Sequence, residues 1–150
     1  RSHATRFGGH DPGVCGKCQE GITRWFVGQV DYGLTCCEQG LELSRTLSHP
    51  PTEAHALNWL CNVLVFRREF QAVVPHAQEL LNLSTAQGLM PFAIMSRRIL
   101  AWAKLEAGQI DEGVAELEQA ITHDDSIGFR LSRPLIRTWL GKGAWMTLSH

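Results

Sequence analysis

The feature that most constrains the fold of this chain is a gap-free internal repeat with a period of 40 residues. The segment Gly28–Gly33 recurs two periods later as Gly108–Gly113. Midway between them stands Arg68–Val73, which keeps an apolar residue, Phe70, at its third position. A fixed period of this size is typical of stacked repeats, in which each unit buries its apolar face against its neighbours. We therefore expect a stack of similar units.

Apolar residues within each period recur at helical spacing, and glycine and proline punctuate the chain between them. Asp11–Pro12 predicts a helix start, because aspartate can cap free amides and proline suits the first turn. Ser48–Pro51 predicts a firm helix stop, because two prolines cannot continue the amide ladder. No period-two alternation indicates a strand. The predicted helices are 13–27, 30–47, 52–66, 69–87, 91–107, 110–123 and 132–147.

These helices predict an all-α fold, a right-handed α-α superhelix of about three and a half helical hairpins. Residues 1–11 are expected to be a flexible lead-in, followed by a single domain over 12–150. The predicted repeats within that domain are 12–50, 51–90, 91–130 and a half repeat 131–150.

Composition narrows the functional classes. A net charge of −1 gives no general attraction to nucleic acid or to anionic membranes. No apolar run approaches the roughly 20 residues that span a bilayer, and the first residues lack the apolar stretch of a signal peptide, so export is not expected. The five cysteines form an odd set without a secretion signal, which favours reduced thiols in a cytoplasm. The expected protein is cytoplasmic and has no nucleic-acid or membrane partner.

Small residues recur where the two helices of each hairpin would cross. We call positions that are 40 residues apart, and so equivalent in the repeat, a column. One such column consists of Gly21, Cys61, Ala101 and Gly141. In this respect the chain resembles tetratricopeptide repeats, whose usual period is about 34 residues. The resemblance implies antiparallel hairpins, and the longer period implies longer helices.

Several short segments carry a closer resemblance, to the tetratricopeptide-like region of large bacterial AAA-type ATPases and adenylate-cyclase-like signalling proteins. It extends from Phe7 to Trp145 and implies a regulatory repeat region without catalytic residues or cofactors. Since no GxxxxGK[ST] nucleotide-binding motif occurs here, any ATPase activity would reside outside this chain. The segments are Gly8–Cys15, Leu47–Pro50, Phe66–Glu69, Gln71–Val73, Thr85–Gly88, Leu100–Ala103 and Gly108–Gln109.

The first helices of tetratricopeptide-like hairpins line a concave groove, and five of their residues here favour binding of a protein or peptide. Trp102 shares its column with Ile22, Asn62 and Lys142, a mixture that indicates a surface position. Amide and cationic donors beside an aromatic anchor can hold a peptide backbone or a terminal carboxylate. The ATPase domain of a parent protein is one candidate partner. The predicted binding residues are Asn58, Asn62, Arg98, Trp102 and Lys142.

Two alternatives to a peptide-binding module stay open. Cys15 and Cys18 form a CxxC pair at a helix start, where thiols can bind metal or undergo redox chemistry, with His10, Asp11, Cys36 or Cys37 as further ligands. Alternatively, the chain is a stand-alone repeat protein that dimerises through its last helix, which has no return partner. The apolar residues left uncovered on that helix would be Leu135, Trp139, Leu140, Trp145 and Met146.

Overall fold

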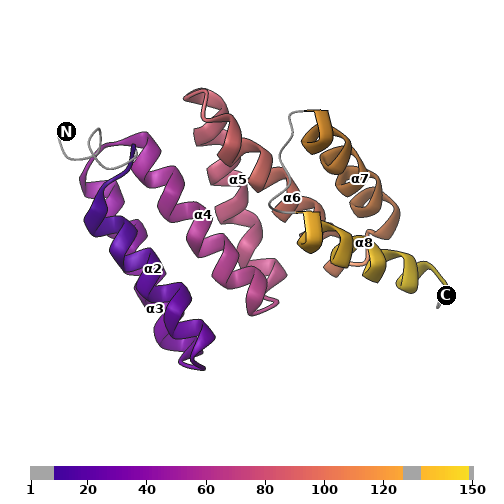
Figure 1. The fold of residues 1–150 in the computed structure, drawn as a ribbon, viewed down its shortest axis with the longest axis horizontal. Coiled ribbons are helices and arrows are strands. Elements are labelled where there is room, and N and C mark those ends of the chain that lie inside the picture. Colours follow the sequence, from indigo (N-terminus) through magenta and orange to yellow (C-terminus); the bar gives the residue numbers. More distant parts are fainter. Residues whose placement is uncertain (1–8, 127–132, 149–150) are drawn as a thin grey trace.

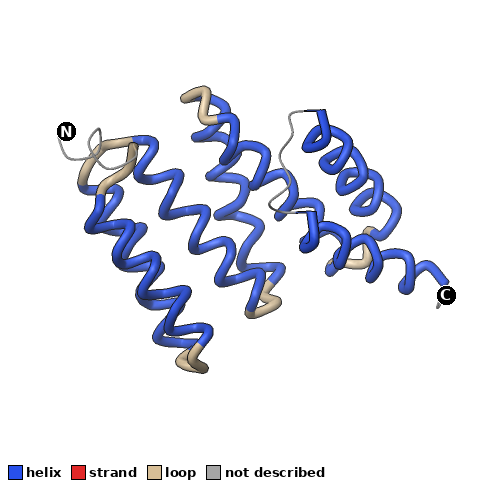
Figure 2. Tube along the Cα trace, in the orientation of Figure 1, coloured by secondary structure: helices blue, strands red, loops and turns tan. Residues whose placement is uncertain are grey.

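A computed structural model describes residues 9–126 and 133–148 of the chain. Every regular element in these ranges is an α-helix, and none of the described residues lies in a strand (Figure 2). The predicted all-α class is confirmed, with helix ends within a few residues of those expected. Most of the expected lead-in, residues 1–8, lies outside the described residues. The helices are α2 (Pro12–Phe26), α3 (Val30–Thr46), α4 (Pro50–Phe66), α5 (Phe70–Ala86), α6 (Met90–Glu106), α7 (Ile110–Ser126) and α8 (Arg133–Leu148).

The helices form an array in which neighbours in sequence are neighbours in space, with α2 and α8 at opposite ends (Figure 1). The first helices of successive hairpins also contact one another: α2 contacts α4, α4 contacts α6, and α6 contacts α8. The second helices α3, α5 and α7 have at most marginal contact among themselves. The first helices therefore form a continuous central row. The second helices pack against this row and are separated from one another.

The central row contains the hydrophobic core. Helix α4 lies in the middle of the array and buries ten of its 17 residues, including Leu57, Leu60 and Leu64. Burial on more than one side suits a helix that contacts α2, α3, α5 and α6. The repeat thus builds one shared core rather than separate cores for each hairpin.

The five connectors from α2 to α7 share one backbone feature, a residue with positive φ. These residues are spaced by 20 positions, half of the sequence repeat. After α2, the amide of Gly28 donates to the carbonyl of Trp25 (3.0 Å) and that of Gln29 to Arg24 (2.9 Å), which closes the helix end in a Schellman motif. The positive-φ residues are Gly28 (87°), Ser48 (48°), Arg68 (60°), Gly88 (68°) and Gly108 (84°).

Pro50 and Pro51 are predicted to stop the helix before them, but in the structure they form the first turn of the next helix, α4. Helix α3 ends at Thr46, and the two prolines occupy the first positions of α4. Proline is well tolerated there, because the first helical amides have no acceptor within the helix and the ring fixes a suitable φ. The prediction that α4 starts at Thr52 is therefore late by two residues.

Helices α2 and α3 cross so closely that their backbones are in contact. A Cβ atom on Gly21 would lie 2.8 Å from the carbonyl oxygen of Gly33, and one on Gly33 would lie 2.7 Å from that of Gly21. The predicted small-residue column is buried at Gly21, Cys61 and Ala101. It fails at Gly141, which is exposed with no atom within 4 Å of its ideal Cβ position.

The last helix covers more of its apolar surface than the sequence suggests. Trp139 is 8% exposed, and Leu135 and Leu140 pack partly buried against the core. Of the five residues expected to be uncovered, Trp145 is the large side chain that remains exposed, with 68% of its surface accessible. The expected bare face is therefore only partly present, and dimerisation through it stays a prediction.

Candidate functional site

The expected exposure of Trp102 is wrong. Its side chain is 3% exposed, and its ring lies 6.0 Å from that of Trp139 in a tilted arrangement. The contact between α6 and α8 along the central row covers this position. Trp102 is thus part of the core, and a partner cannot reach it without displacing α8.

The other predicted binding residues are also engaged within the chain. Arg98 is buried and forms an ion pair with Asp124 of α7, which is fully buried. Asn58 is 5% exposed, and its carbonyl accepts a hydrogen bond from the half-buried side chain of Asn62 (2.7 Å). Lys142 is paired with Glu106 at 2.6 Å. The predicted donor-rich strip is therefore not a free surface, and a binding role for it stays a prediction.

An open groove lies elsewhere and is lined by three helices. The second helices α5 and α7 flank it, and α6, which packs against both, also contributes to its lining. Its volume is about 980 Å³. It exists because α5 and α7 both pack on α6 and have at most marginal contact with each other. The apolar residues that line it are Phe70, Val74, Leu81, Ile94, Leu100, Ala103, Ala107 and Ala120.

Polar side chains give the groove a distinct charge pattern. Lys104 is bonded to Glu116 at 2.6 Å and to Glu112 at 3.3 Å, and the hydrogen bond with Glu116 raises the pKa of the lysine. Arg97 also lines the groove, is exposed, and has no ion pair or hydrogen bond with another described residue. The groove therefore combines an apolar lining with one cation available to an acidic group.

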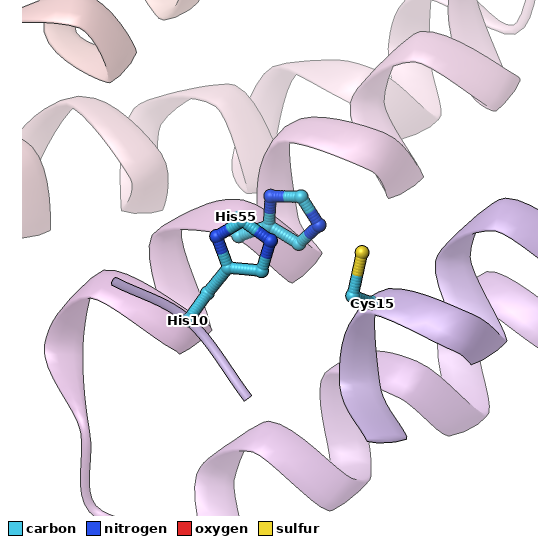
Figure 3. A group of neighbouring side chains, drawn as sticks. All are labelled: His10, Cys15 and His55. Carbon is cyan, nitrogen blue, oxygen red and sulfur yellow. The ribbon is translucent and has the colours of Figure 1, made fainter. Parts of the chain in front are cut away.

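A second candidate site lies near the start of α2, where His10, Cys15 and His55 come together (Figure 3). One ligand atom from each of the three lies within 4.8 Å of the others, and all three side chains are half-buried. The two imidazole rings are stacked, with centroids 3.9 Å apart and planes 10° from parallel. One thiol and two imidazoles form a donor set suited to a transition-metal ion.

Hydrogen bonds between the start of α2 and the start of α4 position this cluster. The Asp11 amide donates to Oγ1 of the buried Thr52 (2.9 Å), which also bonds Nδ1 of His49 (2.8 Å). The Asp11 carboxylate accepts hydrogen bonds from the amides of Gly13 (2.8 Å) and Val14 (3.1 Å), so it caps α2 as the sequence predicts. The segment before α2 is thus tied to α4, which carries His55.

The surroundings of His55 favour a neutral ring. Burial, together with the smaller effect of the neighbouring His10, lowers the pKa of His55 to about 4. Nε2 of His55 is buried and has no hydrogen-bond partner among the described residues. A buried polar atom without a partner is costly, so this nitrogen is available to a ligand.

The two cysteines of the CxxC pair lie in different surroundings, because Cys15 is half-buried and Cys18 is buried. Cys18 is fully buried against α3, where its Sγ would lie 3.1 Å from a Cβ on Gly40. Burial, with smaller contributions from Cys37 and Cys15, raises the pKa of Cys18 to about 12. His10 is one of the further ligands that the sequence predicts, whereas His55 is not among them. The available signal was the period, since Cys15 and His55 are 40 residues apart on the neighbouring helices α2 and α4.

Because Cys15 is the one cysteine that is not buried, we expect one fast-reacting thiol per chain. Burial raises the pKa of Cys37 and Cys61 to about 12, as it does for Cys18, which lowers their thiolate fraction at neutral pH. Reaction with Ellman's reagent in the presence of a chelator should show a rapid phase of one thiol, and denaturant should release the rest. The rapid phase should vanish in Cys15→Ser. Two rapid thiols in the native protein would contradict the burial of the other four cysteines.

No protein-family model matches the chain. The chain is similar to the uncharacterized protein R02095 of Rhizobium meliloti (strain 1021), with 20% identity over 118 residues, which is 79% of this chain. The matched part of this chain corresponds to 12% of the length of that relative. Among the described residues, no helix is long and apolar enough to cross a bilayer. The cytoplasmic location stays a prediction.

Proposed function

We propose that this chain is a non-catalytic protein-interaction module, and that the groove between α5 and α7 binds an amphipathic helix. The observation that carries the proposal is the groove itself, about 980 Å³ with a largely apolar lining. Amphipathic helices commonly place their apolar face in such grooves. The volume lies near the upper end of the roughly 300–1,000 Å³ usual for small-molecule pockets, which suits a peptide.

Charge specifies the partner further. Arg97 is exposed at the groove, whereas Lys104 is already bonded to two glutamates. The bound helix should therefore have an aspartate or glutamate beside its apolar face, placed to pair with Arg97. The long relative supports a role as one segment of a large protein, and the resemblance to bacterial signalling ATPases favours an ATPase domain as the source of the helix.

Substituting Val74 tests the groove directly. Val74 is 41% exposed and lines the groove, so Val74→Asp should place a charge in the apolar contact and weaken helix binding by about 10-fold or more. The probes are peptides selected by phage display against the purified chain, measured by fluorescence anisotropy. Val30→Asp is the matched control, since Val30 is 37% exposed at the start of α3 and does not line the groove.

A charge swap tests the acidic residue. Selected peptides should show apolar residues at i, i+3, i+4 and i+7 together with an aspartate or glutamate. Arg97→Glu should weaken these peptides, and replacing their acidic residue by lysine should restore binding. Selected peptides that bind the Val74→Asp protein as well as the Val30→Asp protein would refute the groove as the binding surface.

A further inference from the structure

We propose that His10, Cys15 and His55 bind one Zn²⁺ ion, with its fourth coordination position open to water or to a partner's side chain. The proposal does not depend on the groove, because the cluster lies on α2, α4 and the residues before α2. Two observations support it: the convergence of three ligand atoms within 4.8 Å, and the buried Nε2 of His55 without a described hydrogen-bond partner.

The donor set selects the ion. A cysteine thiolate and two neutral imidazoles suit Zn²⁺, whereas Mg²⁺ and Ca²⁺ prefer oxygen ligands. Binding requires the Cys15 thiol to lose its proton to solvent, after which the Sγ–zinc bond forms. The ion would also coordinate the unpartnered Nε2 of His55. No electron transfer is involved, since zinc has a single stable oxidation state in proteins.

The stacked rings show what must move. The nitrogen lone pairs lie in the ring planes, and two nearly parallel planes cannot both contain one ion between them. One ring must therefore rotate on binding. His10 is the ring expected to rotate, because it precedes α2, whereas His55 lies within α4. The hydrogen bond from Asp11 to Thr52 keeps the backbone next to His10 in place during this rotation.

Bound zinc would join the start of α2 to α4. The first two hairpins already meet there through Thr52, and a metal bridge would add a strong link between them. Because zinc would bind the folded chain better than the unfolded chain, it should raise the melting temperature in proportion to the logarithm of its free concentration.

The test is a titration of the reduced, chelator-treated protein with Co²⁺, followed by displacement with Zn²⁺. We expect one Co²⁺ per chain and an absorption band from thiolate-to-cobalt charge transfer. Cys15→Ser should abolish the band, and His55→Gln should lower affinity by at least the roughly 10–100-fold that loss of an outer-shell partner costs. His76→Gln is the matched control, because His76 is half-buried on α5, away from the cluster.

Circular dichroism should show that each variant keeps its helices. Should His55→Gln fail to fold, nitrogen-detected NMR of the unsubstituted protein decides, because zinc should shift Nε2 of His55. Absence of stoichiometric binding, or a charge-transfer band that survives in Cys15→Ser, would overturn the site. Neither result bears on the groove, which the peptide measurements test separately.

Discussion

Replacing Asp124 by alanine should destabilise the chain by about 3–5 kcal/mol, the cost typical of breaking a buried ion pair. The side chains of Arg98 and Asp124 are 4% and 0% exposed, and their ion pair joins α6 to α7. Burial lowers the pKa of Arg98, while the adjacent carboxylate opposes that shift. Without the carboxylate, the guanidinium would keep its desolvation cost and lose the charge that offsets it. Urea unfolding followed by circular dichroism measures the loss.

A double substitution separates the ion pair from simple packing. Arg98→Met with Asp124→Leu removes both charges and restores apolar volume, so it should be less destabilising than Asp124→Ala alone. Glu79→Ala is the surface control. Its partner Arg45 lies 2.7 Å away, but both side chains are at least 40% exposed, so the change should cost no more than about 1 kcal/mol. Equal losses in the buried and exposed pairs would contradict the role of burial.

Gly33→Ala should destabilise the first hairpin by about 3 kcal/mol, the upper end of the usual cost of overpacking. The new methyl group would lie 2.7 Å from the carbonyl oxygen of Gly21 and 3.0 Å from the amide nitrogen of Trp25. Both contacts are to backbone, which cannot rotate away as a flexible side chain could. Helices α2 and α3 would have to separate, which would open the core at Cys37.

Gly16→Ala is the matched control, a glycine-to-alanine change in α2 with no atom within 4 Å of the new Cβ. It should stabilise the chain by up to about 1 kcal/mol, because alanine has the higher helix propensity. Thermal unfolding of the two variants compares them directly. If Gly33→Ala were as stable as Gly16→Ala, the close crossing of α2 and α3 would be wrong.

The helices were predictable because their signals are local. Glycine or proline lies close to most helix ends, and the 40-residue period indicates which segments are equivalent. The turn at Arg67–Arg68 shows how the period helps: Arg68 adopts positive φ where the equivalent residues, Gly28 and Gly108, are glycines. A propensity argument alone would not have placed a left-handed residue there.

Burial of individual positions was not predictable in the same way. Trp102 was expected at the surface because its column mixes Ile22, Asn62 and Lys142, yet each layer of the array has different neighbours. In α6 that position meets Trp139, which occupies a different column of the repeat. The groove was missed for a related reason: its width depends on the separation of α5 and α7, a tertiary quantity. The pairing of Cys15 with His55, in contrast, could have been read from the period.

The uniform connectors have a consequence for how quickly the chain folds. Three residues separate successive helices up to α7, and all but the weakest helix contacts join helices one or two places apart. Forming the core therefore closes only short loops. The entropy of loop closure is therefore small at each step, and the relative contact order is low. Helical proteins with this topology typically fold in microseconds to milliseconds. A nascent chain could thus fold its first hairpin before the last helix has been synthesised.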